Sequence, residues 1–410
     1  MTKTLFTFRL LPGNRFTLPL LLSIIENSRW SRLFNLSIAG SARELLNRHT
    51  GQQPGIAAYS FMTTEWPVVW RELRRLKPLL PDTLFIAGGP HPTGNPDSAF
   101  KTGFHTIFHG EAEKTLPRFC NDYLNRPESV QNSIYRQKQP VDIDSYLPVS
   151  QTFDFIPPLE ITRGCHYRCS FCQTGQSGKP IYRSLESVKA YLASLKSLSR
   201  TSRTGYICPS GFEYGSEKPG SAHPGLIENL LAMTKQAGIR YLEYGIFPSE
   251  VRPGTVKKDL LKLIQKYCSN RKITLGAQSG TNRMLHKIRR GHTTEAVEES
   301  VALIREHGFT PVVDLMIGLP GETPEDRLRS MDWIQCLNNR YQIRCQMHHF
   351  IPLSGTVFEH SEPSPLDRET EIKLDRLHRG GICTNWWEKG REMAIRVVRL
   401  RNRINGSQPE

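Results

Sequence analysis

The chain has 410 residues, 38% of them hydrophobic, and carries 54 Lys and Arg against 39 Asp and Glu, a formal net charge of +15. This length exceeds that of a usual single domain, so it predicts two domains and a tail. The longest apolar stretch, residues 18–25, is too short to span a membrane, and Arg9 interrupts the place where a signal peptide needs apolar residues. We therefore expect a soluble, cytoplasmic protein whose nine cysteines stay reduced.

Residues 1–125 alternate short apolar runs with helical stretches. In the stretch from residue 67 to residue 80, Val69, Leu73, Leu76 and Leu80 line one helix face. The runs predicted as strands are residues 5–8, 36–39, 56–60, 84–87 and 106–108. This alternation predicts an α/β fold, a doubly wound, Rossmann-like, mostly parallel sheet whose ligand binds beyond the carboxyl ends of the strands.

The loops after these strands contain glycines and small polar residues. Glycine lets the backbone approach a flat ligand closely, and hydroxyl groups can bond its polar rim. The candidate ligand-binding residues are Ser60, Phe61, Gly88, Gly89, Pro90, His91, Gly110 and Glu111. We interpret the isolated His91 as a hydrogen-bonding loop residue and not as a metal ligand. The polar, Pro-containing residues 126–155 predict a linker.

After the linker, Cys165, Cys169 and Cys172 form a Cys-x3-Cys-x2-Cys pattern. Three thiolates on one short loop can hold three corners of a [4Fe–4S] cluster and leave its fourth iron open. Structural zinc, with His166 as a fourth ligand, is the alternative on spacing alone. The alternation of strand and helix signals over the next 200 residues or so favours the cluster, because zinc loops usually build small domains.

At this point the chain resembles the radical S-adenosylmethionine (SAM) superfamily, over residues 158–356. Phe171 matches an aromatic position that meets the SAM adenine, and residues 275–281, 287–293 and 314–322 resemble later SAM-contacting motifs. Residues 209–215 stand where many relatives have Gly-Gly-Glu. The resemblance implies a partial (β/α)6 TIM-like barrel over residues 156–357. The SAM-binding residues that it implies are Phe171, Ser210, Gly211, Phe212, Gln278, Ser279, Arg290 and Ile317.

The N-terminal unit in turn resembles the cobalamin-binding domain found in front of radical SAM domains. The resemblance rests on Gly-Gly-Pro-His at residues 88–91 and Gly-Glu-x-Glu at residues 110–113. No Asp-x-His-x-x-Gly motif supplies a lower axial histidine, and many relatives hold cobalamin with its nucleotide base detached. The implied cofactors are therefore a [4Fe–4S] cluster, SAM and cobalamin.

An unactivated carbon has no acidic proton, so its chemistry depends on a cofactor that the protein places. The resemblance implies a cobalamin-dependent radical SAM C-methyltransferase. Residues 247–253 look most like archaeal members, among which are enzymes that methylate a glutamine of methyl-coenzyme M reductase. We expect a peptide or protein substrate and an electron donor such as ferredoxin or flavodoxin. The alternatives are a rearrangement or oxidation without methyl transfer, an RNA-modifying enzyme, and a non-catalytic iron–sulfur sensor that binds nucleic acid.

The C-terminal residues 358–410 predict a basic extension. Arg391, Arg396, Arg399, Arg401 and Arg403 surround apolar residues such as Leu400, which is typical of an amphipathic helix or strand. The net charge favours an acidic partner, either nucleic acid or a protein surface. The basic end is interpreted either as a docking surface or as a solvated face.

Overall fold

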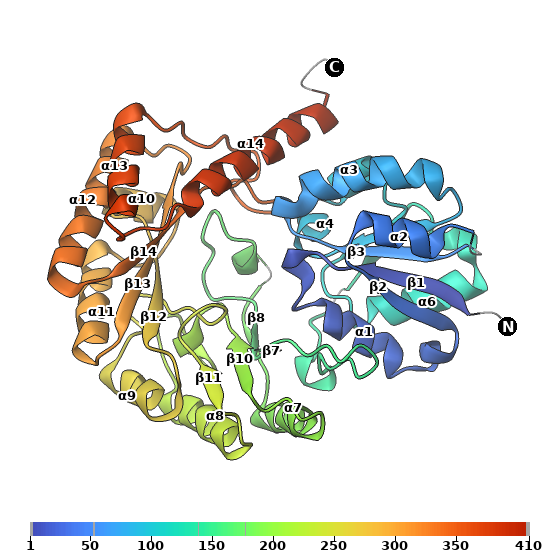
Figure 1. Cartoon of the computed structure of the whole chain (residues 1–410), viewed down its shortest axis with the longest axis horizontal. Helices are drawn as coiled ribbons and strands as arrows, with labels where there is room; N and C mark the ends of the chain where they lie inside the picture. Colours follow the sequence, from blue (N-terminus) through green and yellow to red (C-terminus); the bar gives the residue numbers. More distant parts are fainter. Residues whose placement is uncertain (1–2, 52–53, 138, 177, 407–410) are drawn as a thin grey trace. The chain divides into compact units, whose positions relative to one another are not determined.

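A computed structural model describes residues 3–51, 54–137, 139–176 and 178–406 (Figure 1). The chain divides into two compact units. The first contains Met1–Pro157, Leu353–Glu359 and Ile395–Glu410, and the second contains Pro158–Pro352 and His360–Ala394. Within the described ranges, no helix is both long enough and apolar enough to cross a bilayer.

The first unit is built on a six-stranded parallel sheet of order β2-β1-β3-β4-β5-β6. Its strands are β1 (Thr4–Arg9), β2 (Phe34–Ala39), β3 (Ile56–Ser60), β4 (Leu84–Gly88), β5 (Thr106–His109) and β6 (Ser133–Arg136). Its helices are α1 (Leu18–Glu26), α2 (Ala42–His49), α3 (Trp66–Leu76), α4 (Pro90–Gly94), α5 (Pro96–Thr102) and α6 (Thr115–Asn125). The predicted doubly wound fold is confirmed, and the order in which strands are added to the sheet reverses between β1 and β3.

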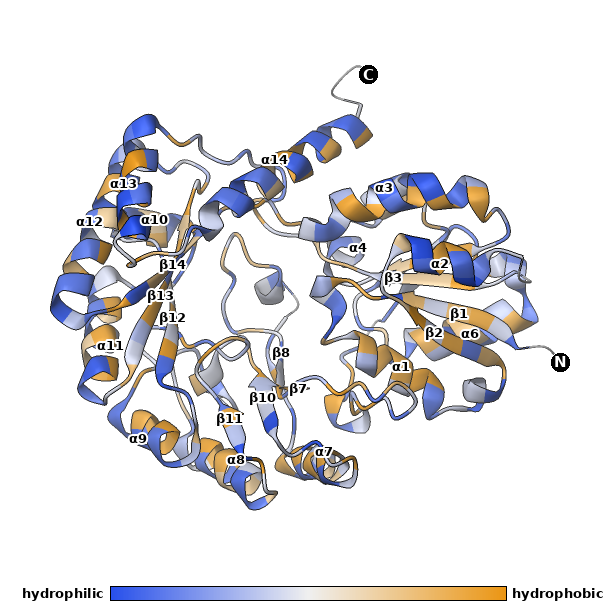
Figure 2. Cartoon of the chain, in the orientation of Figure 1, coloured by the Kyte–Doolittle hydropathy of each residue, from blue (hydrophilic) through white to orange (hydrophobic). Residues whose placement is uncertain are grey.

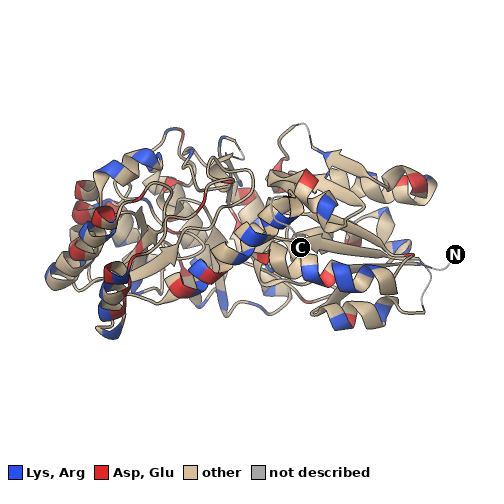
Figure 3. Ribbon diagram, turned by 90° about the horizontal axis from the view of Figure 1, so that it is seen from above, with Lys and Arg blue, Asp and Glu red and all other residues tan. Residues whose placement is uncertain are grey.

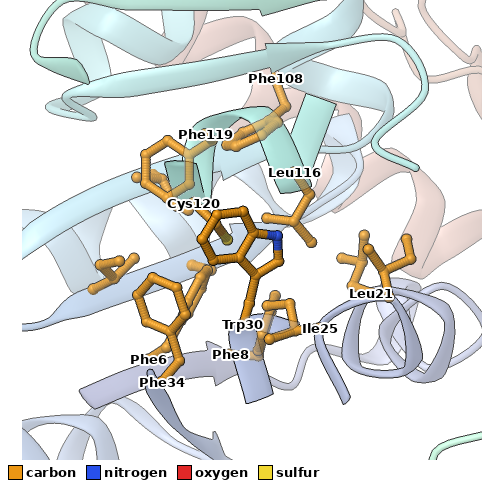
Figure 4. Packing of buried hydrophobic residues seen from close by; sticks show 14 of the residues in the cluster. Phe6, Phe8, Leu21, Ile25, Trp30, Phe34, Phe108, Leu116, Phe119 and Cys120 are labelled. Carbon is orange, nitrogen blue, oxygen red and sulfur yellow. The ribbon is translucent and has the colours of Figure 1, made fainter. Parts of the chain in front are cut away.

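Separate apolar cores cover the two faces of this sheet. Aromatic residues dominate the face under α1 and α6, where Phe6 stacks on Phe8 with ring centroids 4.8 Å apart (Figure 4). The other face packs against α2, α3 and α5, and its core includes Leu400 from α14 (Trp386–Ile404). The hydropathy colouring in Figure 2 shows the apolar strands beside helices with mixed faces. Each fully buried large apolar side chain contributes about 1.5–3 kcal/mol to folding.

The predicted linker over residues 126–155 is wrong in part. Residues 133–136 form β6, which pairs with β5, and the ring of Tyr135 stacks on Phe108 at 5.5 Å. This strand has only two apolar residues, Ile134 and Tyr135, so its pattern is too short to stand out from a polar loop. The predicted C-terminal extension is also corrected, because residues 353–359 and 395–410 belong to the first unit.

The second unit is a partial barrel of parallel strands, as the resemblance implied. One sheet has the order β11-β10-β7 and the other the order β12-β13-β14, and a parallel bridge between Val251 and Leu275 joins the two series. Its strands are β7 (Leu159–Glu160), β10 (Arg203–Ile207), β11 (Tyr241–Glu243), β12 (Lys272–Gln278), β13 (Thr310–Ile317) and β14 (Arg344–His349), with a small hairpin of β8 (Thr162–Arg163) and β9 (Ile181–Tyr182). Its helices are α7 (Leu185–Ser197), α8 (Pro224–Gln236), α9 (Lys258–Tyr267), α10 (Asn282–Lys287), α11 (Thr294–Glu306), α12 (Pro324–Tyr341) and α13 (Arg368–Arg379).

Candidate functional site

The three-cysteine loop begins directly after β8, at the carboxyl end of the first barrel strand. The antiparallel β8–β9 pair closes the base of this loop. The Ser170 N–H donates to the Ile288 carbonyl at 3.0 Å, and the Cys172 N–H donates to the Cys169 carbonyl at 3.1 Å. A Cβ atom on Gly175 would lie 2.3 Å from the Tyr167 carbonyl oxygen, so only glycine fits there. These contacts fix the loop before any cofactor binds.

Two arginine side chains lie beside the middle cysteine. Arg290 Nη1 is 3.5 Å from Cys169 Sγ, and Arg252 Nη1 is 4.0 Å from the same sulfur. Arg252 is buried, lies over the Tyr167 ring at 3.4 Å from its centroid, and donates to the Arg290 carbonyl. Burial raises the pKa of Cys165 above its usual value. The guanidinium groups are positive charges that favour thiolates and a negatively charged cluster on this loop.

The donor set fits the cluster better than the zinc alternative. His166 Nε2 lies 3.0 Å from the Ser216 carbonyl oxygen and 3.2 Å from the Tyr182 hydroxyl, so the proposed fourth zinc ligand already has partners. Within the described part of the chain, no three His, Cys, Asp or Glu side chains converge on one metal-ion position. A cubane has a separate iron for each thiolate, so its ligands need not converge.

The segment after β10 places one residue that the sequence prediction left out. Glu213 Oε1 accepts hydrogen bonds from the Tyr167 hydroxyl at 2.9 Å and from the Gly220 N–H at 2.6 Å. Its Oε2 is buried without a partner among the described residues, as is the hydroxyl of the predicted residue Ser210. The signal for Glu213 is its position within residues 209–215, the segment that stands where many relatives of the resemblance have Gly-Gly-Glu.

Two other residues predicted in this segment have mainly structural roles. The Phe212 side chain is buried and packs against Tyr244 with ring centroids 6.3 Å apart. The Gly211 N–H donates to the Glu250 carbonyl at 2.8 Å, and a Cβ on Gly211 would lie 2.3 Å from the Ser249 carbonyl oxygen. The Gly211 carbonyl also accepts from the Tyr244 hydroxyl, so both backbone polar groups of Gly211 are engaged within the protein.

The end of β12 brings together the next predicted residues. Gln278 has a left-handed φ of 76° at an irregularity in the β12–β13 pairing. Arg290 Nη2 donates to the Gly276 carbonyl at 2.6 Å, and a Cβ on Gly276 would meet this guanidinium. Ser279 is buried, and its hydroxyl accepts from the Thr281 N–H at 3.3 Å. The end of β12 is thus hydrogen-bonded to the same arginine whose guanidinium lies beside Cys169.

His292 extends this group. Its Nε2 lies 3.2 Å from the Ala277 carbonyl oxygen, and its buried Nδ1 has no partner among the described residues. Burial, Arg290 and Arg252 together lower the pKa of His292 to about 3, so its imidazole is neutral. The histidine lies in the predicted Arg-Gly-His-Thr motif, although only Arg290 was singled out as a binding residue there.

Two carboxyl groups add to the polar interior of the barrel. Burial first, and then the charge of Glu250, raises the pKa of Asp314 well above its usual value. Burial also raises the pKa of Glu250, while Arg290 opposes this change. Asp314 Oδ1 is a buried atom with no hydrogen-bond partner in the described ranges. Ile317 lies buried at the end of the same strand, and its carbonyl accepts from the Phe350 N–H at 2.8 Å.

These unpaired atoms test whether the barrel fits a polar cofactor. Buried polar atoms without partners are uncommon, because each one costs about 1–3 kcal/mol. The four that the described residues contain are Ser210 Oγ, Glu213 Oε2, His292 Nδ1 and Asp314 Oδ1. All four belong to the second unit: Asp314 lies on β13, Ser210 and Glu213 follow β10, and His292 lies between α10 and α11. A ligand with amino, hydroxyl and carboxylate groups, such as SAM, offers partners for such atoms.

In the first unit, the predicted loops follow neighbouring strands. Ser60 ends β3, Gly88 ends β4, and Gly110 follows β5, so these three positions share one sheet edge. The Gly110 N–H donates to Thr93 Oγ1 at 3.0 Å, and Glu111 Oε2 accepts from the Val141 N–H at 2.9 Å. Pro90 and Gly110 are exposed at this edge, while Gly88, Gly89 and Glu111 are partly exposed. Their contact with a ligand stays a prediction.

His91 and Phe61 are inside the unit. His91 Nε2 lies 2.9 Å from the Ser98 hydroxyl, and its Nδ1 lies 2.8 Å from the Ser354 hydroxyl. Its ring lies against those of Trp66 and Phe61 at 4.5 and 5.3 Å. Burial lowers the pKa of His91 to about 3. Both nitrogens are therefore engaged, as expected for a hydrogen-bonding loop residue, and a direct side-chain contact of His91 or Phe61 with a corrin is not supported.

The sequence profile of the Radical SAM superfamily matches residues 159–334. The matched segment lies entirely within the second unit, so the likeness to this superfamily is a likeness of that unit. Its match covers the cysteine loop, the segment of Ser210 and Glu213, the end of β12 and Asp314. The cysteine loop and the unpaired buried atoms of this unit fit the [4Fe–4S] cluster and the SAM that the resemblance implies.

Similar proteins include enzymes of several kinds. The threonylcarbamoyladenosine tRNA methylthiotransferase MtaB of Aquifex aeolicus is 27% identical over 310 residues, covering 72% of this chain and 70% of that protein. The tRNA-2-methylthio-N(6)-dimethylallyladenosine synthase of Chlorobium phaeobacteroides is 27% identical over 233 residues, which are 54% of this chain and 48% of that protein. The chain thus spans about half of the length of the second relative.

Solved structures resemble the chain beyond the radical SAM domain. The radical SAM methyltransferase TsrM of Kitasatospora setae, solved with cobalamin and a [4Fe–4S] cluster, has a TM-score of 0.61 at 15% identity, over 87% of this chain and 77% of that one. The cobalamin-dependent radical SAM enzyme OxsB, solved with aqua-cobalamin and SAM, has a TM-score of 0.60 at 14% identity, over 100% of this chain and 63% of that one. At these identities the likeness is one of fold.

Proposed function

We propose that this protein is a cobalamin-dependent radical SAM methyltransferase that methylates an unactivated carbon. The observation that carries the proposal is the combination of a radical SAM domain with a Rossmann-like unit of strand order 2-1-3-4-5-6, in a fold shared with TsrM and OxsB. When bound, the cluster and SAM would supply a carbon radical, and cobalamin would supply the methyl group.

The roles proposed for the protein's own residues are binding and placement. Cys165, Cys169 and Cys172 would hold the cluster, with Arg252 and Arg290 offsetting its negative charge. Ser210, Glu213 and His292 offer unpaired buried atoms to the polar groups of SAM. The edge at Gly88, Pro90 and Gly110 would receive the flat face of cobalamin.

Cluster binding is tested by anaerobic reconstitution with iron and sulfide. We expect about four irons in each chain and none above background after Cys165, Cys169 and Cys172 are all replaced by Ala. Tight zinc binding without iron uptake would reject the cluster.

Cobalamin binding is tested with a pair of variants at one position. Gly110 has a left-handed φ of 87°, and no neighbouring atom lies within 4 Å of the point where a Cβ would stand, so Gly110→Ala and Gly110→Phe carry a similar backbone cost. Only the phenyl group would block the sheet edge. We expect Gly110→Ala to retain cobalamin uptake, followed by absorbance, and Gly110→Phe to lose most of it. Equal uptake by the two variants would place the ligand elsewhere, and full activity without cobalamin would reject the methyl-transfer chemistry.

A peptide or protein is the first substrate class that we propose, on the resemblance of residues 247–253 to archaeal enzymes that modify a protein. A modified RNA is the second candidate, and the relative MtaB, a tRNA methylthiotransferase similar over 72% of this chain, supports it. Mass spectrometry of proteins and of RNA from a strain that lacks the gene distinguishes them. The class that loses a methyl group is the substrate class, and loss of a sulfur-containing group instead would reject methyl transfer. A rearrangement or oxidation remains the alternative chemistry if no methyl group is lost.

A further inference from the structure

The first unit has a second feature, on the helices that cover one face of its sheet. A hollow of about 800 Å³ is lined by residues of α2, of α3 and the turn after it, and of the last turn of α14. All these lining residues belong to the first unit. The volume lies in the range of pockets that accept small ligands or parts of larger ones.

The charged residues that line the hollow are mostly arginines. Five of them, Arg43, Arg71, Arg74, Arg75 and Arg403, are exposed, and the described lining contains no lysine. None of the five has a carboxylate partner among the salt bridges of the described residues. The one acidic lining residue, Glu72, is bound by Arg9 through contacts of 2.7 and 3.1 Å. The surface therefore carries a net positive charge. Figure 3 shows the Lys and Arg along the helix that leads to the C-terminus.

An aromatic ring lies among these arginines. The Trp70 ring is partly exposed, with the guanidinium of Arg74 4.9 Å and that of Arg403 5.0 Å from its centroid. The exposed side chains of Val68 and Leu79 give the hollow an apolar surface as well. Arginine side chains pair with phosphates through two parallel N–H groups and also stack on flat rings, whereas lysine acts as a point charge. An indole combined with arginines is therefore suited to a partner that has both phosphates and flat bases.

We propose that this arginine-lined hollow binds a segment of single-stranded nucleic acid, with phosphates on the arginines and a base stacked at Trp70. An acidic peptide would satisfy the charges but would leave the Trp70 surface and the planar geometry unused. Nucleic-acid binding at this hollow requires none of the cofactors. Its test is therefore independent of the proposed methyl transfer.

The test measures binding of a fluorescent oligo(U) 12-mer to the full-length protein, with poly-glutamate as the competing acidic chain. The variant Arg43→Gln/Arg74→Gln/Arg75→Gln is compared with Arg240→Gln/Arg271→Gln/Arg289→Gln, which removes the same charge from exposed positions of the second unit. We expect the first variant to bind oligo(U) at least tenfold more weakly than the second. The slope of log K against log salt should also fall by about 2 in magnitude, at about 0.7 for each lost phosphate contact.

Trp70→Leu tests the stacking and leaves the charge unchanged. We expect it to weaken oligo(U) binding about tenfold and to leave poly-glutamate binding unchanged. If the triple Gln variant unfolds, Arg43→Lys/Arg74→Lys/Arg75→Lys keeps the charge and should still bind more weakly than wild type, since the paired N–H geometry is lost. Equal binding by the hollow and control variants would overturn the proposal. So would the absence of binding by wild type at low salt, or poly-glutamate binding as tight as that of oligo(U).

Discussion

At the scale of single residues, Arg290 connects two parts of the candidate site. Its guanidinium donates to the Gly276 carbonyl at the end of β12 and lies 3.5 Å from the cysteine sulfur at position 169. A positive charge so close to a cluster stabilises its reduced, more negative form.

We expect Arg290→Gln to lower the midpoint reduction potential of the reconstituted cluster by roughly tens of millivolts, because the nearby positive charge is lost. A redox titration followed by electron paramagnetic resonance measures it, after equal iron content has been established. Arg289→Gln is the matched control, since Arg289 is the exposed neighbour. Equal potentials for the two variants would show that Arg290 has only a structural role.

Glu322 gives a prediction about pH. Burial raises its pKa from 4.5 to about 7, although the Gly318 N–H donates to it at 2.6 Å and Arg327 lies 3.7 Å away. The folded protein therefore holds a proton that the unfolded chain has lost. The contribution of Glu322 to stability is complete below about pH 4.5 and is lost as the pH rises towards 7.

We therefore expect Glu322→Gln to gain stability relative to wild type as the pH rises from 4.5 to 7, at no more than about 1.4 kcal/mol per pH unit. Denaturant unfolding at several pH values measures this difference. Glu325→Gln, which removes an exposed carboxylate from the first turn of the helix that follows Glu322, should leave the pH dependence unchanged. A pH-independent difference between Glu322→Gln and wild type would contradict the raised pKa.

At the scale of elements, the turn from β4 into α4 depends on close backbone contact. Gly89 has a φ of 91°, and a Cβ there would lie 2.8 Å from both the Phe61 backbone nitrogen and the Ser60 hydroxyl oxygen. The glycine is thus required by the fold of the loop itself, and a large residue at this position would not isolate an effect on ligand binding.

Gly89→Ala and Gly110→Ala share a left-handed φ, but only the first creates a clash. We expect Gly89→Ala to lower the free energy of unfolding of the first unit by about 1–3 kcal/mol more than Gly110→Ala does. Thermal unfolding of the two purified variants provides the comparison. Equal losses would mean that the loop relaxes without cost.

The elements differ in how far the sequence predicts them. The first five strands and the helix face with Val69 and Leu73 are predictable because their apolar runs are long or periodic. The strand β6 is not predictable from the sequence. It forms because it pairs with β5, and four residues carry too little pattern to indicate that pairing. The cysteine loop is found by its spacing, whereas Arg252 is not, because no local pattern links it to a sulfur 83 residues away.

At the scale of the whole molecule, two units with separate cores predict two unfolding transitions. Leu400 is 6% exposed in the core of the first unit, while Ile395 on the same helix is 44% exposed. We expect Leu400→Ala to lower the first unit's stability by about 2–5 kcal/mol and Ile395→Ala to change it little. Calorimetry with and without the reconstituted cluster assigns each transition to a unit. The cluster should raise the unfolding temperature of the second unit only. A shift of both transitions in Leu400→Ala would show that the units unfold together.

The placement of Ser354 and Leu400 in the first unit also bears on how the protein is made. Ser354 contacts His91, and Leu400 joins the core beside Trp66, so the N-terminal sheet obtains these partners from the far end of the polypeptide. A ribosome that adds about 5–20 residues per second needs roughly tens of seconds to pass from the end of the sheet to Leu400. During that interval the strands that were made first are without part of their packing, and the second unit is synthesised through to Ala394 before Leu400 emerges. The N-terminal sheet is translated first and is completed last.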